Sequence, residues 1–210
     1  MAGAAESERA RATRDQITRA AREVVLDRGY AATSMDAVTA AAGVSKQTLY
    51  SYFPSKALLF RDFLDQELGQ LRVDVGALPT ITSRAQLRAT LMALASALVS
   101  RFMREDTVNL LRVVLGDAYR VDEARGAVRD VIPGQLFALV EGILGAAAAG
   151  GAIEPPQPGL TARLFIGPVV SFVVLDGVLA DGPPRPPDMA TLGFVVDAFL
   201  ATLPSAGGHL

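Results

Sequence analysis

The stretch from Thr33 to Lys56, TSMDAVTAAAGVSKQTLYSYFPSK, decides the fold of the N-terminal part of the chain. The hydroxyl of Thr33 or Ser34 can cap a short helix, which we expect from about Met35 to Ala42. Gly43 follows this helix and supplies a left-handed stop. The stretch therefore begins with a helix that is bounded at both ends by its own sequence.

A second short helix begins two residues later. Ser45 is its expected N-cap, the helix is expected over Lys46 to about Tyr52, and Pro54 lies just past its end. Two short helices joined by a turn that contains glycine are typical of a helix-turn-helix.

One longer helix is expected before this motif, from about Arg14 to Arg28. Its apolar residues follow helical spacing and form one stripe: Ile17, Ala20, Ala21, Val24 and Val25. Residues 1–12 are expected to be a disordered N-terminal tail. Residues 13–56 then make up a three-helix DNA-binding domain.

Helical periodicity continues through residues 57–210, and no strand alternation stands out. A fourth helix is expected from Ser55 onward, followed by a loop over residues 76–82. Further helices are expected at Ser83–Arg104, Thr107–Tyr119, Glu123–Ala149, Leu160–Ala180 and Pro187–Leu203. The helix over Glu123–Ala149 is expected to be interrupted or bent at Pro133–Gly134. The sequence thus predicts an all-α protein with a small N-terminal head and a larger C-terminal helical body.

The composition excludes several kinds of chemistry. The 210 residues include no Cys and one His, His209, so we expect no disulfide, no thiolate or histidine metal site and no Ser-His or Cys-His catalysis. No catalytic residue and no cofactor is predicted. The N-terminus lacks the apolar segment of a secretory signal, and the apolar run Leu164–Leu175 is shorter than the roughly 20 residues that span a bilayer. We therefore expect a cytoplasmic protein that does not associate with a membrane.

The residues of the second short helix suggest how the head binds DNA. Leu49 faces inward, which leaves an outward face made of Lys46, Gln47, Thr48 and Ser51. Gln can pair with adenine, Thr can contact a thymine methyl group, and Lys can bond guanine or a phosphate. Tyr50 and Tyr52 suit a surface lined by phosphates. Ser45 and Lys56 lie at helix N-termini, which attract phosphate.

The head also resembles a known family. The order Ala20-Ala21, Gly29-Tyr30, Thr33-Ser34, Ala42-Gly43-Val44-Ser45, Thr48-Leu49-Tyr50, Tyr52-Phe53 and Ser55-Lys56 closely resembles the DNA-binding head of the tetracycline-repressor (TetR) family of bacterial transcription regulators. The resemblance implies a three-helix head on an all-helical ligand-binding body that dimerises through its last two helices. It implies DNA contacts at Thr33, Ser45, Lys46, Gln47, Thr48, Tyr50, Tyr52 and Lys56. Val25 departs from the pattern, since the family usually has Phe there.

Two further sets of residues are predicted in the body. The candidates for binding a small molecule are aromatic or polar residues on its helices: Phe102, Asn109, Arg112, Tyr119, Phe137 and Glu141. The last two expected helices are too apolar to face water, so they are predicted to pair with the same helices of a second chain. The residues predicted at that dimer interface are Phe165, Val169, Phe172, Val196 and Phe199.

These observations favour a homodimeric transcription regulator that binds a near-palindromic site in double-stranded DNA. The favoured interpretation is a repressor that is released from its operator by a small, largely apolar molecule. One alternative keeps the DNA-binding head on a ligand-free body that serves for dimerisation or partner docking. A second alternative is a small helical enzyme with an incidental helix-turn-helix.

Overall fold

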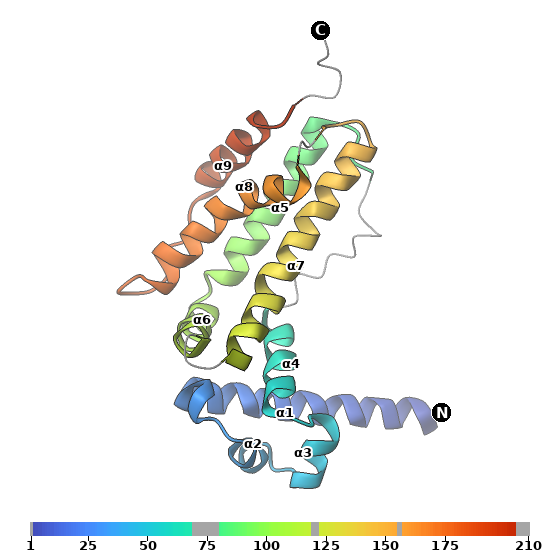
Figure 1. Ribbon diagram of the computed structural model, residues 1–210, viewed down its shortest axis with the longest axis vertical. Coiled ribbons are helices and arrows are strands. Elements are labelled where there is room, and N and C mark those ends of the chain that lie inside the picture. Colours follow the sequence, from blue (N-terminus) through green and yellow to red (C-terminus); the bar gives the residue numbers. More distant parts are fainter. Residues whose placement is uncertain (1, 69–79, 119–121, 155–156, 205–210) are drawn as a thin grey trace. The chain divides into compact units, whose positions relative to one another are not determined.

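The computed structural model describes residues 2–68, 80–118, 122–154 and 157–204 (Figure 1). All regular structure in these ranges is helical, which confirms the predicted all-α fold. The chain divides into two compact units. The first consists of Met1–Gln70 and Asn109–Ile132, and the second of Leu71–Val108 and Pro133–Leu210.

The first unit begins with four helices, α1 (Ala2–Ala32), α2 (Met35–Ala42), α3 (Lys46–Tyr52) and α4 (Lys56–Leu68). The bounds of α2 and α3 are those that the sequence predicts. The unit also includes residues 109–118 of α6 (Glu105–Ala118) and the first part of α7 (Asp122–Ala149). The predicted head of residues 13–56 is therefore only part of a larger unit.

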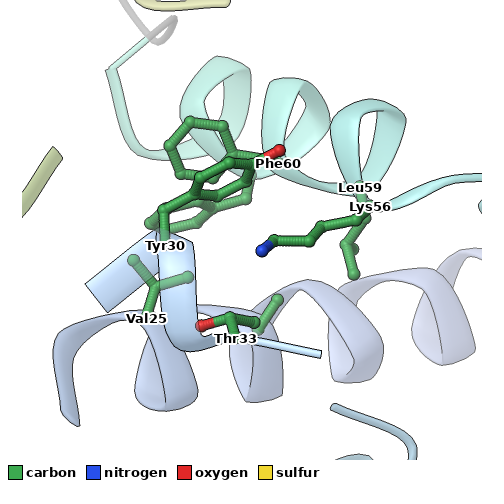
Figure 2. A pocket seen from close by; sticks show the side chains of 8 residues that line it. Val25, Tyr30, Thr33, Lys56, Leu59 and Phe60 are labelled. Atoms are coloured by element: carbon green, nitrogen blue, oxygen red, sulfur yellow. The ribbon is translucent and has the colours of Figure 1, made fainter. Parts of the chain in front are cut away.

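Helix α1 differs from its prediction at both ends. It begins at Ala2 and not near Arg14, so residues 2–12, expected as a disordered tail, are helical. Their composition explains this, because Ala, Glu and Arg are strong helix formers. Gly29 interrupts the helix with φ 79° and ψ 164°, and a final turn continues to Ala32. The bend directs Tyr30 against Phe60 of α4, with 4.2 Å between ring centroids (Figure 2).

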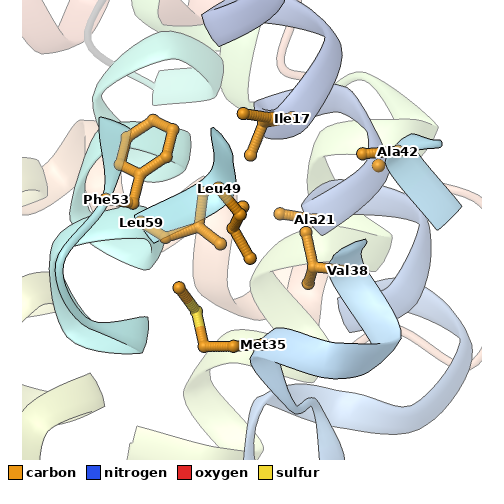
Figure 3. Close-up of a cluster of buried hydrophobic side chains, with 9 residues drawn as sticks. Ile17, Ala21, Met35, Val38, Ala42, Leu49, Phe53 and Leu59 are labelled. Atoms are coloured by element: carbon orange, nitrogen blue, oxygen red, sulfur yellow. The ribbon is translucent and has the colours of Figure 1, made fainter. Parts of the chain in front are cut away.

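A small apolar core joins the first four helices (Figure 3). Leu49 of α3 is fully buried in it, and α1, α2 and α4 surround that side chain. The other buried members are Ile17, Ala20, Ala21, Met35, Val38, Ala42, Phe53 and Leu59. Gln16 adds a polar tie, since its side-chain amide donates to the carbonyl of Ala42 at 2.7 Å. These contacts fix α2 and α3 against α1.

The second unit contains α5 (Arg84–Phe102), α8 (Pro158–Phe172), the π-helical segment η3 (Val173–Val178) and α9 (Met189–Ala201), with the remainder of α6 and α7. Helix α7 runs as one helix from Asp122 to Ala149. The helix is therefore not interrupted at Pro133–Gly134, the first of the two alternatives predicted there, although the boundary between the two units falls at this point.

Helix α9 packs on α5 and α8 through polar and aromatic contacts. The guanidinium of Arg84 donates to the carbonyl oxygens of Leu200 and Leu203 at the end of α9. Arg88 forms two hydrogen bonds with the carboxylate of Asp197, at 2.6 and 2.8 Å. These arginines tie the last helix to a segment more than 100 residues earlier in the chain.

Helix α8 and η3 together form a long apolar segment. Among the described residues, Gly159–Val178 is the one stretch whose length and mean hydropathy of 1.6 would let it cross a membrane. Core helices of soluble proteins pass the same test. Phe165 and Val169 are buried here, and the ring of Phe165 lies 5.3 Å from that of Phe199 in α9. One side of the segment thus belongs to the core of the second unit.

Candidate nucleic-acid interface

Short-range contacts set the geometry of α2 and α3. The hydroxyl oxygen of Ser34 accepts from the N–H of Ala37 at 3.1 Å, and that of Ser45 accepts from the N–H of Thr48 at 3.0 Å. Between the two helices Gly43 has φ 64°, a left-handed conformation that glycine adopts without strain. Each bend in the motif is therefore specified by a residue suited to it.

Helix α3 has a buried side and an exposed side. Leu49 is fully buried, whereas Lys46, Gln47 and Tyr50 are exposed. Thr48 is half-buried, and its hydroxyl oxygen lies 2.8 Å from that of Ser45. The first turn of α3 thus presents an ammonium, an amide and two hydroxyls at a helix N-terminus, a combination that can hydrogen-bond base edges and phosphates.

Lys46 has a partner on α2. Its Nζ lies 2.7 Å from Oδ1 of Asp36. The hydrogen bond that the ammonium donates to Asp36 and the attraction between the two charges raise the pKa of Lys46 above its usual value. Sequence reasoning missed Asp36, because ten residues and a turn separate it from Lys46 and no local spacing rule links them.

Thr33 and Lys56 are engaged inside the first unit (Figure 2). Thr33 is buried, and its hydroxyl donates to the carbonyl of Gly29 at 2.7 Å. Lys56 is half-buried, with Nζ 4.1 Å from the centre of the Tyr30 ring and 3.4 Å from the carbonyl oxygen of Ala31. The Lys56 ammonium thus contacts the end of α1.

Two other residues singled out in the sequence lie in the packing of the head. Tyr52 is half-buried against the apolar core. Val25 is buried and lines a space of about 10 Å³ together with Tyr30, Phe60 and Phe63. The space beside Val25 is thus no larger than one water molecule.

The predicted ligand-binding residues are divided between the two units. Asn109 and Arg112 belong to the first unit and hydrogen-bond each other, with 3.3 Å from Arg112 Nη1 to Asn109 Oδ1. The second unit contains three: Phe102, which is buried; Phe137, which is half-buried under the Arg163 guanidinium; and Glu141, which is exposed. Tyr119 lies outside the described residues.

A surface hollow of about 280 Å³ lies in the second unit, between the end of α5 and the segment that leads into α9. Its buried apolar floor includes Val99, Met103 and Leu192, and polar groups of Ser96, Ser100 and Arg104 also line it. The predicted ligand residues do not line this hollow. The signal that could have indicated it is the pair of hydroxyls of Ser96 and Ser100, four residues apart in α5.

Most residues predicted at a dimer interface are buried inside the second unit of the same chain. Phe165, Val169, Val196 and Phe199 are buried in the second unit, and Phe172 is half-buried. The exposed apolar side chains on α8, η3 and α9 are instead Leu160, Leu164, Val170, Leu175, Met189 and Phe194. Phe194 has 75% of its surface exposed. The helices chosen from the sequence thus do carry an uncovered apolar surface, which includes Leu164.

Two family models match the chain. Residues 17–63 match the model described as bacterial regulatory proteins of the tetR family. Residues 89–202 match the C-terminal domain of AefR-like transcriptional repressors, and this second match spans more than half of the chain.

Individual proteins are similar to shorter or longer parts of the chain. The HTH-type transcriptional activator FasR of Mycolicibacterium smegmatis is 44% identical over 82 residues, which are 38% of this chain and 37% of that protein. A TetR-family transcriptional regulator from Mesorhizobium loti MAFF303099 has a similar structure, with a TM-score of 0.72, 24% identity and coverage of 93% of this chain and 98% of that one. The flavonoid-responsive regulator FrrA gives a TM-score of 0.68 at 28% identity, with 90% and 93% of the two chains covered.

Proposed function

Because the chain belongs to the TetR family of bacterial regulatory proteins, we propose that it acts as a cytoplasmic homodimer whose α3 helices bind a near-palindromic operator in duplex DNA. The family consists of transcription regulators and not enzymes, so the enzyme alternative is set aside. The observation that carries the proposal is the exposed first turn of α3, which is held in place by the buried Leu49.

Each residue of this surface has an expected role. Gln47 and Thr48 contact base edges, since an amide can pair with adenine and a threonine methyl group can meet thymine. Ser45, Lys46, Tyr50 and Tyr52 contact the backbone or the groove edge. Thr33 and Lys56 contribute mainly by holding the end of α1, and Lys56 can add a phosphate contact if its ammonium leaves Tyr30.

A selection of bound duplexes from a random pool tests this assignment. The wild-type protein is expected to enrich a two-fold symmetric site, with half-sites about one helical turn or more apart. Gln47→Ala is expected to weaken binding to that site by roughly 1–3 kcal/mol and to relax the preference at one base pair of each half-site. Ser51→Ala is the control, because the Ser51 hydroxyl already bonds to the carbonyl of Thr48. Unchanged affinity and preference in Gln47→Ala would contradict the base-reading role.

The proposed dimer is supported by the exposed apolar residues of α8, η3 and α9. A monomer in water would leave Leu164, Leu175 and Phe194 more than half exposed, and pairing of these surfaces in two copies would cover them. Phe194→Arg is expected to give monomers with much weaker operator binding, whereas Phe194→Leu should remain dimeric. Light scattering that finds the wild type monomeric at micromolar concentration would refute the dimer.

The proposed effector is a small, largely apolar molecule that binds the second unit and releases the operator. Two observations support it: the hollow floored by Val99, Met103 and Leu192, and the likeness to a flavonoid-responsive regulator at 28% identity. By linkage, effector and operator must weaken each other's binding by the same factor. Flavonoids are therefore a suitable first probe set, with melting temperature and operator release measured for each compound. Binding without release would favour a body that serves dimerisation or partner docking.

The protein can regulate transcription in either of two directions, repression or activation. We propose repression, as an effector-released DNA-binding protein would give, but the segment that matches FasR belongs to a protein named as an activator. Deleting the gene and measuring transcripts next to the selected operator separates the two. Transcripts that rise on deletion indicate a repressor, and transcripts that fall indicate an activator.

A further inference from the structure

Asp36 places a negative charge beside the first turn of α3. It lies in the first turn of α2, and its carboxylate reaches across the helix-turn-helix to the ammonium of Lys46, 2.7 Å away. Both side chains are 65% exposed. Exposed ion pairs contribute little to the stability of the fold. The effect of this pair is therefore expected on what the exposed face of α3 binds.

The carboxylate of Asp36 offsets the unfavourable electrostatic energy of Lys46 at its place in α3. A cation in the first turn of a helix lies at the positive end of the helix dipole, and α3 has no acidic residue of its own in that turn. Asp36 supplies the missing negative charge from another helix. The Lys46 ammonium is thus already paired with a carboxylate when the exposed face of α3 meets a DNA phosphate.

We propose that Lys46 binds DNA by exchanging partners, from the carboxylate of Asp36 to a phosphate, and that Asp36 acts as a built-in competitor that lowers the affinity for every duplex. This inference rests on the proposed function, since it requires that the exposed face of α3 meets DNA. Phosphate contacts that ignore sequence supply essentially all non-specific binding. A competitor for one of them therefore limits retention on random DNA, and the base contacts of Gln47 and Thr48 decide where the protein stays.

Neutral variants at position 36 test the competition on a random duplex. Asp36→Asn is expected to tighten binding about two- to fivefold for each head. The slope of log K against log salt should stay close to that of the wild type, because Lys46 contacts a phosphate in both complexes. Asp36→Ser is a second neutral variant, and Asp36→Glu should behave like the wild type. Asp27→Asn is the matched control, because it removes an exposed carboxylate that pairs with Arg28 on α1. Circular dichroism checks that each variant is folded.

The same measurements in a Lys46→Gln background separate exchange from simple repulsion. If Lys46 exchanges partners, Asp36→Asn should lose its effect on affinity once Lys46 is gone, and Lys46→Gln alone should flatten the salt slope by about 0.9 per head. An equal gain in both backgrounds, or no gain in either, overturns the inference while salt-dependent DNA binding by the wild type still supports the proposed function. Absence of duplex binding by every form would overturn the proposed function itself.

Discussion

The helix-turn-helix and the body helices are stabilised by contacts of different range along the chain. In α2 and α3, the caps join residues three apart, Ser34 to Ala37 and Ser45 to Thr48. In the second unit, Arg84 and Arg88 bind residues of α9 that are 116 and 109 positions away. The helix-turn-helix is therefore specified largely by local sequence, whereas the body depends on pairings that form only when its distant segments come together.

The largest effect is expected from truncating the side chain at the centre of the apolar core of α1 to α4. Leu49→Ala is expected to destabilise the first unit by about 2–5 kcal/mol, since it leaves a cavity at a fully buried position. Operator binding should be lost while the second unit stays folded. Hydrogen exchange measured by mass spectrometry should show lost protection in α1 to α4 and retained protection in α5 and α9. Equal loss of protection in both units would mean that they fold as one.

A glycine in the body tests whether contacts between distant segments stabilise the second unit. A Cβ at Gly150 would lie 2.1 Å from the carbonyl oxygen of Ile81, and 2.8 Å from its carbonyl carbon, so the backbone would have to move. Gly150→Ala is expected to destabilise the second unit by roughly 1–3 kcal/mol. Gly145→Ala is the matched control, since nothing lies within 4 Å of its added Cβ and alanine favours helix. Urea unfolding that ranks the two variants the other way would contradict this contact.

The separation along the sequence between contacting residues explains which features the sequence could predict. The bounds of α2 and α3 follow from Ser34, Gly43 and Ser45, which act on their near neighbours. The pair between Asp36 and Lys46 does not follow, because a turn brings together two residues that no helical spacing connects. Nor does the engagement of Lys56 with Tyr30, which needs the bend at Gly29.

In the body, the sequence identified the apolar helices but not which side of each faces the core. Phe165 and Leu164 are adjacent and equally apolar, yet the first is fully buried and the second is 52% exposed. The ring of Phe199 decides between them by packing on Phe165. Periodicity alone gives a helix its apolar positions, whereas the choice between two apolar faces depends on neighbouring helices.

The cap of α3 offers a smaller and more local change. Ser45→Ala removes the acceptor for the N–H of Thr48, which is expected to cost about 0.5–2 kcal/mol. Because the loss falls on the helix proposed to enter the groove, operator binding should weaken together with the stability of the head. Ser45→Asp retains an acceptor and should restore stability without restoring DNA affinity, since the carboxylate repels phosphate. Thermal unfolding and duplex binding measured together check both parts. Recovery of DNA affinity in Ser45→Asp would argue against a phosphate close to position 45.

The smallest expected effect is a pH dependence at the start of α9. The N–H of Thr191 donates to Oδ1 of Asp188 at 2.8 Å, and this hydrogen bond lowers the pKa of the carboxyl below its usual value. A carboxyl whose pKa is lower in the folded chain stabilises the fold above its unfolded value, about 3.9, and that contribution is lost as the pH falls through the folded value.

Asp188→Asn keeps a good N-cap but cannot titrate. At pH 7 the wild type should therefore melt about 1–2 °C above this variant, and the gap should close as the pH falls below about 4. Asp181→Asn removes a charge from the same connecting segment without touching a helix N-terminus, so it controls for net charge. A gap between wild type and Asp188→Asn that stays constant from pH 7 to pH 3 would show that the negative charge of Asp188 does not stabilise α9. The local rule that specifies α2 and α3 would then fail to extend to this helix of the body.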